Sequence, residues 1–93
     1  MASLHKTESG TAYIDLSWDE LALYSHNYFP ICDSCLKDLI GEDHVILIPI
    51  LNEAFCPKCG KRKLTTIKNY PEDQPIAERR TKYYCKFFGL EAT

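Results

Sequence analysis

The chain has 93 residues, of which 45% are apolar and 26% are charged, and its formal net charge is −2. These values are typical of a single folded domain near the lower end of the usual size range and exclude wholesale disorder. The longest apolar run, VILIPIL, has seven residues, whereas a membrane-spanning helix needs about 20. The N-terminus has no apolar run that would serve as a secretory signal, so we expect a cytoplasmic protein. Small domains bury little apolar area, and a metal is a common supplement.

The charge is unevenly distributed along the chain. Residues 1–55 carry two lysines against nine acidic residues, a net charge of −7. Residues 56–93 carry nine basic against four acidic residues, a net charge of +5. Such an asymmetry indicates either a charged partner or two halves that face each other and partly cancel. The sequence leaves both interpretations open.

The N-terminal third predicts a strand and a helix within residues 11–30. Residues 1–10 are polar, and we expect them to be flexible. The next segment, TAYIDL, alternates apolar and polar side chains, which predicts a short strand with one buried face. Ser17 and Glu20 then have the spacing of a capping box, so a helix is expected over residues 18–26.

The middle of the chain predicts two extended segments, one before and one after the cysteine pair Cys56 and Cys59. DHVILIPILNEAF, residues 43–55, is apolar and rich in β-branched side chains, which predicts a buried strand. Pro49 lacks an N–H and is expected at an edge or a bulge, with a turn at residues 52–53. KLTTIKNY, residues 63–70, predicts a further strand, whereas LKDLI, residues 36–40, is compatible with a helix.

A second helix is predicted over residues 75–88, PIAERRTKYYCKFF, with proline at its first position and Gly89 as its terminator. A helical projection places its apolar side chains on one broad face: Ile76, Ala77, Tyr83, Tyr84, Phe87 and Phe88. The same projection places Arg80 within that apolar arc and Cys85 roughly opposite its centre.

Four of the five cysteines have the spacing of a four-cysteine metal site. Cys32 and Cys35, and then Cys56 and Cys59, each enclose two residues, and twenty residues separate the two pairs. Two thiolates on one tight turn occupy two corners of a tetrahedron, and a second such turn supplies the other two. We expect one structural zinc ion, because four thiolates leave no open position for a reacting water. The spacing alone does not distinguish zinc from a single tetrahedral iron.

Other uses of the cysteines fit the sequence less well. Disulfides require an oxidising compartment, and no feature of the sequence indicates export. A thioredoxin-like redox pair requires a βαβ setting and does not include a second pair twenty residues away. Cys85 is left over, and we expect it to be a reduced thiol on a helix, outside the metal set.

CPKCG, residues 56–60, resembles the knuckles of the zinc-ribbon group, which commonly have the sequence Cys-Pro-x-Cys-Gly. The resemblance covers residues 31–69 and implies a zinc ribbon there. Gly60 is expected to adopt a positive φ that turns backbone N–H groups toward the sulfurs. The resemblance departs at CDSCL, where Leu36 stands in the place often held by glycine. A treble-clef arrangement, in which a helix begins at the second pair, is the competing architecture.

The predicted fold is α+β: a small zinc-ribbon β-hairpin core with an N-terminal strand and helix and a C-terminal amphipathic helix. We expect a non-catalytic interaction module, such as a small intracellular regulator or inhibitor that binds a larger protein. The alternative, implied by the frequency of zinc ribbons in transcription and translation machinery, is nucleic-acid binding through the basic C-terminal half. The candidate contacts for either partner are Lys61, Arg62, Lys63, Arg79, Lys82 and Lys86. No motif for catalysis stands out, so neither an enzyme nor a small-molecule substrate is expected.

Overall fold

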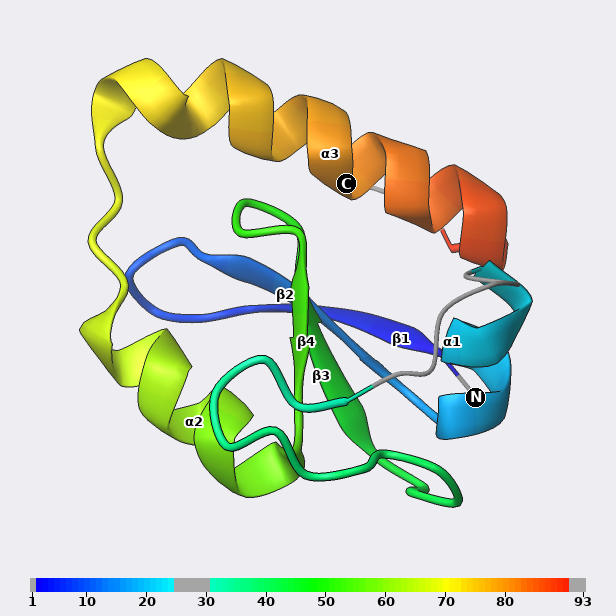
Figure 1. The fold of residues 1–93 in the computed structure, drawn as a ribbon. Helices are drawn as coiled ribbons and strands as arrows, with labels where there is room; N and C mark the ends of the chain where they lie inside the picture. Colours follow the sequence, from blue (N-terminus) through cyan, green and yellow to red (C-terminus); the bar gives the residue numbers. More distant parts are fainter. Residues whose placement is uncertain (1, 25–30, 91–93) are drawn as a thin grey trace.

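The structure is a computed structural model that describes residues 2–24 and 31–90 (Figure 1). Within those residues, one antiparallel sheet of four strands in the order β1-β2-β3-β4 combines with three α-helices, the α+β class that was predicted. The strands are β1 (Ser3–Lys6), β2 (Ala12–Leu16), β3 (Val45–Ile48) and β4 (Glu53–Phe55). The helices are α1 (Trp18–Tyr24), α2 (Pro57–Thr66) and α3 (Gln74–Phe88), with a 3₁₀ turn, η1 (Pro71–Asp73), before α3. No helix in the described ranges is long and apolar enough to cross a membrane.

The N-terminal segment, expected to be flexible, contains the edge strand β1. β1 pairs antiparallel with β2, so that Leu4 lies opposite Ile14, and the N–H of Ala2 donates a hydrogen bond to Glu20 Oε2 at 2.7 Å. The alternation predicted for β2 is present, since Ile14 and Leu16 are buried. An edge strand can form from a polar sequence because one of its edges and part of its surface remain in water.

Hydrogen bonds confirm the helix start predicted from Ser17 and Glu20. Ser17 N donates to Glu20 Oε1 at 3.0 Å, and Glu20 N donates to Ser17 Oγ at 3.3 Å, which is the reciprocal pairing of a capping box. α1 therefore begins at Trp18 as predicted. The predicted helix end near His26 lies outside the described residues.

We expect Glu20→Gln to remove a pH-dependent part of the stability. Burial alone would raise the pKa of Glu20, but hydrogen bonds from the Ser17 and Ala2 N–H groups lower it below its ordinary value of 4.5. A carboxyl whose pKa is lowered by folding stabilises the fold above its unfolded-state pKa, and this contribution disappears as the pH falls through the folded-state pKa. The free energy of unfolding should therefore fall more between pH 6 and pH 3 in the wild type than in Glu20→Gln. Equal decreases would contradict this role.

The apolar run at residues 43–55 forms a hairpin and not one continuous strand. β3 ends at Ile48, residues 49–52 form a turn, and β4 returns with Phe55 opposite Ile46. Pro49 lies in this turn, where its missing N–H leaves no ladder bond unmade. Asn52 adopts a φ of 56°, a left-handed conformation in which asparagine is enriched. The predicted turn at residues 52–53 overlaps the observed turn only at Asn52, because the turn begins at Pro49 and Glu53 already belongs to β4.

The strands lie between two helices. Residues opposite each other in an antiparallel pair share a face, so the register places Ile14 and Leu47 on one face and Ile46 and Phe55 on the other. α2 packs on the second face, since it contacts β3 and β4 and Gly60 lies against Ile46. α3 contacts β2, and Figure 1 shows α2 and α3 on opposite sides of the molecule with the strands between them.

α3 confirms the predicted C-terminal helix but buries a different face. Gly89 ends it with a φ of 71° and donates its N–H to the Cys85 carbonyl, as expected of a C-terminal glycine. Tyr84 and Cys85 are buried, and burial raises the pKa of the Cys85 thiol. Three residues of the predicted apolar face are instead exposed: Ile76, Tyr83 and Phe87. Cys85, predicted opposite the apolar face, therefore lies on the inner side of the helix.

Two side chains fasten α3 to the β3–β4 turn. Arg80 Nη1 donates a hydrogen bond to the Ile50 carbonyl, and the Tyr84 hydroxyl donates to Asn52 Oδ1 at 2.6 Å. These bonds satisfy polar groups of a turn that the sheet ladder leaves unpaired. They also account for an arginine within the apolar arc of α3, because its guanidinium reaches over the turn.

Candidate metal centre

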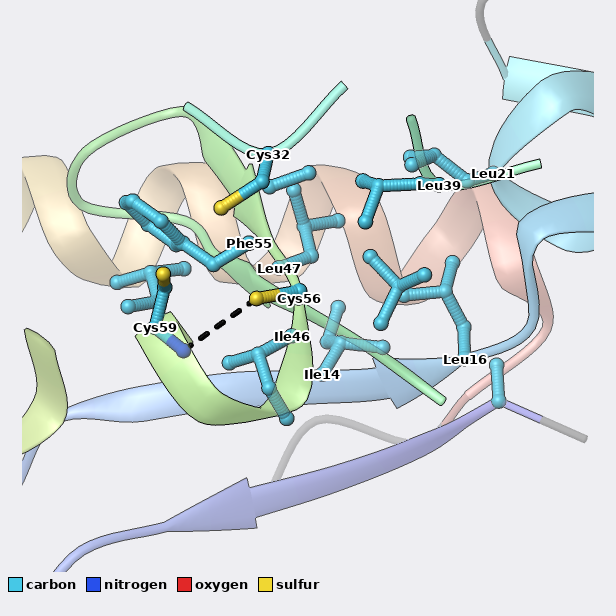
Figure 2. Close-up of a cluster of buried hydrophobic side chains, with 14 of the residues drawn as sticks. Ile14, Leu16, Leu21, Cys32, Leu39, Ile46, Leu47, Phe55, Cys56 and Cys59 are labelled. Atoms are coloured by element: carbon cyan, nitrogen blue, oxygen red, sulfur yellow. Dashed lines mark hydrogen bonds between the residues drawn. The ribbon is translucent and has the colours of Figure 1, made fainter. Parts of the chain in front are cut away.

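The structure brings together the four cysteines of the two pairs. The Sγ atoms of Cys32, Cys35, Cys56 and Cys59 all lie within 4.8 Å of one another, and none of the four forms a disulfide. A tetrahedral zinc ion with Zn–S bonds of about 2.3 Å requires S···S separations of about 3.8 Å. The cluster therefore fits one metal ion at its centre. Figure 2 shows the sulfurs of Cys32, Cys56 and Cys59 converging beside Phe55 at the edge of the core.

The first pair lies on a tight turn. Cys32 N donates to the Lys37 carbonyl at 2.8 Å, and Leu36 N donates to the Cys32 carbonyl at 2.9 Å. The N–H of Cys35 points at Cys32 Sγ, with a separation of 3.5 Å. Residues 36–40, which the sequence made compatible with a helix, form turns and an isolated bridge. The bridge joins Asp38 to Ile31, and Ile40 lies in a turn.

The second pair lies at the N-terminus of α2, and the predicted strand after it is wrong. Cys56 is the N-cap residue, its Sγ accepts from the N–H of Cys59 at 3.5 Å, and Pro57 begins the helix. Proline at the first helical position and a side-chain acceptor at the cap together favour a helix start. These local features outweigh the β-branched content of residues 63–70, of which 63–66 are helical.

A helix begins at the second cysteine pair, as in the competing treble-clef architecture and not as in the predicted ribbon. The first knuckle leads into the β3–β4 hairpin, and the helix α2 carries the second pair. A ribbon would require a further hairpin after the second pair, which the helix replaces. The cysteine spacing is common to both architectures, so it predicted the cluster without selecting the fold around it.

Gly60 is required by packing and not by a positive φ. It lies within α2 and is not among the described glycines with positive φ. A Cβ atom at this position would lie 2.5 Å from the Cβ of Ile46, a separation that atoms in van der Waals contact do not reach. Glycine therefore allows α2 to approach β3 closely, and this approach carries Cys59 to the other three cysteines.

Leu36 occupies the place often held by glycine and adopts a glycine-like backbone. Its φ is 63°, in the left-handed region that costs an ordinary L-residue roughly 1–2 kcal/mol. Its side chain is 68% exposed. The knuckle thus keeps its turn geometry in spite of the leucine, with the conformational cost stored at this residue.

Asp33 joins the first knuckle to β4, a contact that no sequence pattern predicts. Asp33 N donates to the Ala54 carbonyl at 2.9 Å, and Asp33 Oδ2 accepts from Ala54 N at 2.8 Å. Because Cys56 follows Ala54 by two residues, these two hydrogen bonds fix one cysteine pair relative to the other. An aspartate between paired cysteines is a plausible backbone acceptor, but its partner is set only by the folded hairpin.

We expect Asp33→Ala to destabilise the fold by about 1–2 kcal/mol, because Ala54 N loses its acceptor in a partly buried place. The metal affinity should fall as well, since the two knuckles lose a constraint. Asp33→Asn is the matched control, because its amide oxygen can accept the same bond. Chemical unfolding and chelator competition would measure the two effects. An alanine variant that matches the wild type in stability and in metal affinity would show that the hydrogen bonds between Asp33 and Ala54 are dispensable.

Hydrogen bonding and burial separate the pKa values of the clustered thiols. Burial alone would raise the pKa of Cys32, but backbone N–H groups of Cys35, Cys56 and Ser34 lower it to about 6. A hydrogen bond with the Cys56 side chain and, to a smaller extent, burial raise the pKa of Cys59 to about 11. The surroundings of Cys32 therefore favour its thiolate, whereas those of Cys59 oppose ionisation. A cation held by the sulfurs would favour both thiolates.

The base beside the cluster is Lys37, which sequence spacing did not single out. A hydrogen bond to Glu42 and the charge of Glu42 raise the pKa of Lys37, with smaller contributions from Cys56 and Cys35. The Lys37–Glu42 ion pair has an N···O distance of 3.0 Å. Lys37 thus combines an ion pair with an electrostatic interaction at the thiol cluster.

The six basic candidate contacts are exposed but lie on two separate helices. Three belong to α2 and three to α3: Lys61, Arg62, Lys63, Arg79, Lys82 and Lys86. Figure 1 shows these helices apart from each other, on opposite sides of the strands. The two sets therefore do not merge into one continuous basic patch.

The evidence that the centre can bind a metal ion comes from the geometry of the four cysteines. Comparisons with protein-family models, with curated proteins and with solved structures gave no match. Four convergent sulfur donors can hold one metal ion, and together they fill a tetrahedral coordination sphere. A centre of this kind stabilises a fold and presents no free coordination position to a substrate.

Proposed function

We propose that the protein is a non-catalytic zinc-binding interaction module, a small regulator or inhibitor that binds a larger protein. The observation that carries the proposal is the mutual approach of the four Sγ atoms within 4.8 Å. Four thiolates saturate a tetrahedral zinc ion, so the metal serves the fold and not a reaction. Recognition is then left to the exposed surface that the metal holds in place.

Zinc is favoured over iron by its usual occurrence in sites of this kind. Tetrahedral thiolate coordination suits both metals, and zinc is the usual ion of small structural four-cysteine sites. Metal analysis of the purified chain should find one zinc per molecule and no visible absorption. A red or brown protein with one iron per chain would contradict this assignment.

A protein partner is favoured by the kind of surface that is exposed. The described residues expose several large apolar side chains: Leu23, Leu36, Ile40, Tyr70, Ile76, Tyr83 and Phe87. Exposed apolar groups favour protein interfaces, whereas a nucleic-acid interface is dominated by clustered basic residues. Here the basic residues are divided between α2 and α3, and residues 1–55 carry a net charge of −7.

Purification of the full-length tagged chain from its own cells, with nuclease treatment and metal analysis of the same sample, tests the proposal. We expect a stoichiometric protein complex that contains zinc and survives the nuclease. In parallel, single-stranded and duplex nucleic acids should show no binding at low salt. Binding that falls steeply with salt, and that is lost when Arg79, Lys82 and Lys86 are neutralised, would establish the nucleic-acid alternative instead.

A further inference from the structure

We propose that residues 33–43, which we term the knuckle loop, form the surface through which the chain docks on its partner. The partner is a protein that presents an apolar pocket bordered by lysine or arginine side chains. This inference rests on the proposed function, because it assigns a surface to the protein-binding role. Three features of the loop carry it: a strained exposed leucine, a rigid scaffold and an acidic border.

Leu36 exposes its side chain at a conformational cost that brings no burial. Its φ is 63° and its side chain is 68% exposed. Glycine would make the same turn without strain, so neither packing nor turn geometry explains a leucine here. Residues held in unfavourable backbone conformations are concentrated at functional sites. A contact made outside the chain supplies the missing explanation.

The loop is held firmly enough to present its apolar groups in fixed positions. Leu36 N is bonded to the Cys32 carbonyl, and both Cys32 and Leu39 are buried in the core. Ile40, the next residue, is 50% exposed and its N–H donates to Asp38 Oδ1 at 2.9 Å. Leu36 and Ile40 thus extend outward from a segment that is secured on both sides of Leu39.

The border of the loop is acidic. Four carboxylates and one lysine give it a net charge of −3: Asp33, Lys37, Asp38, Glu42 and Asp43. Lys37 is paired with Glu42, and a zinc ion with four thiolates would add a charge of −2. Such a surface repels nucleic acid and complements cationic side chains around an apolar pocket.

The exposed apolar groups of α3 lack this combination. Ile76, Tyr83 and Phe87 lie in a regular helix, where exposure carries no backbone strain. Basic residues accompany them on the same helix, so a partner for α3 would be acidic, whereas the partner of the knuckle loop presents basic side chains. Ile76 therefore serves as a control position on another surface.

Site-specific photo-crosslinking with the full-length chain in its own cells tests the inference. A benzophenone-bearing amino acid replaces Leu36, Ile40 or Ile76 in turn. We expect the first two positions to give adducts with the same protein, through peptides that contain lysine or arginine, and position 76 to give none. Adducts at position 76 alone, or adducts to acidic peptides, would overturn the knuckle loop as the docking surface and leave the proposed function standing. Adducts to nucleic acid alone, or none at any position, would overturn both.

The crosslinked protein, once purified, provides a quantitative second test. Leu36→Gly and Ile40→Ser should each weaken binding at least tenfold, whereas Ile76→Ser should retain wild-type affinity. Leu36→Gly should also melt at the same temperature as the zinc-loaded wild type or higher, because glycine relieves the positive φ. That combination separates recognition from structure. Unchanged affinity in both loop variants contradicts the proposed surface.

Discussion

Removal of the metal, or the substitution Cys59→Ser, is expected to unfold the protein. Three of the four cluster cysteines belong to the buried core: Cys32, Cys56 and Cys59. A metal ion bound by the cluster would therefore stabilise the core directly. Zinc binding contributes on the order of 10–16 kcal/mol in small peptides, comparable to the ~5–15 kcal/mol net stability of a whole domain. Circular dichroism before and after chelation, followed by reloading with zinc, measures this loss and its reversal.

Cys85→Ser is the matched control for the metal experiment. Cys85 is as buried as the core cysteines but is not one of the four clustered residues. Its substitution should leave the zinc content at one per chain and cost only the burial of a hydroxyl, about 1–3 kcal/mol. A thermal melt that does not change after verified removal of the metal would refute the structural role of the centre.

Gly60→Ala is expected to destabilise the fold, against the trend for glycine within a helix. Replacement of an exposed helical glycine by alanine normally stabilises by about 1 kcal/mol. Here the new Cβ would lie 2.5 Å from Ile46 Cβ, so α2 must move away from β3, at a cost of about 1–3 kcal/mol or more. The same displacement moves Cys59, and the affinity for the metal should fall. Chemical unfolding and chelator competition measure the two effects.

Whether Gly60→Ala lowers or raises the stability decides whether α2 depends on its close approach to β3. Lys61→Ala, at the next and exposed position of α2, is the control and should alter stability by less than about 0.5 kcal/mol. Ile46→Ala removes two of the three atoms that the new Cβ would meet. The double variant should therefore lose less stability than the sum of the single variants. A more stable Gly60→Ala protein would show that α2 does not depend on this close approach.

The parts of the fold that local chemistry determines were predictable from the sequence. The capping box at Ser17 and Glu20 and the terminator Gly89 act within one turn of helix, so their spacing alone locates a helix end. The two cysteine pairs were also sufficient to predict the cluster, because each pair needs only its own turn to place two sulfurs. Local determinants of this kind are independent of the tertiary structure.

One error arose from competing local signals, because Thr65 and Thr66 are β-branched, yet Pro57 and the Cys56 cap start a helix that continues through them. The other errors arose where tertiary packing decides. The buried face of α3 is selected by the bonds from Arg80 and Tyr84 to the β3–β4 turn, which a helical projection does not contain. In the same way, the role of Gly60 depends on Ile46, a residue on another element.

The β3–β4 hairpin is held at both of its ends, which has a consequence for the affinity of the cysteine cluster for a metal ion. At one end β4 leads directly into Cys56, and at the other the turn is bonded to Arg80 and Tyr84 of α3. A metal ion that binds the cluster would hold Cys56 and thereby β4 in place, which favours the position in which α3 is bonded to the turn. By reciprocity, a molecule that draws α3 away from the turn would lower the affinity of the cluster for the metal ion. The metal affinity would then report on an event at the far side of the sheet.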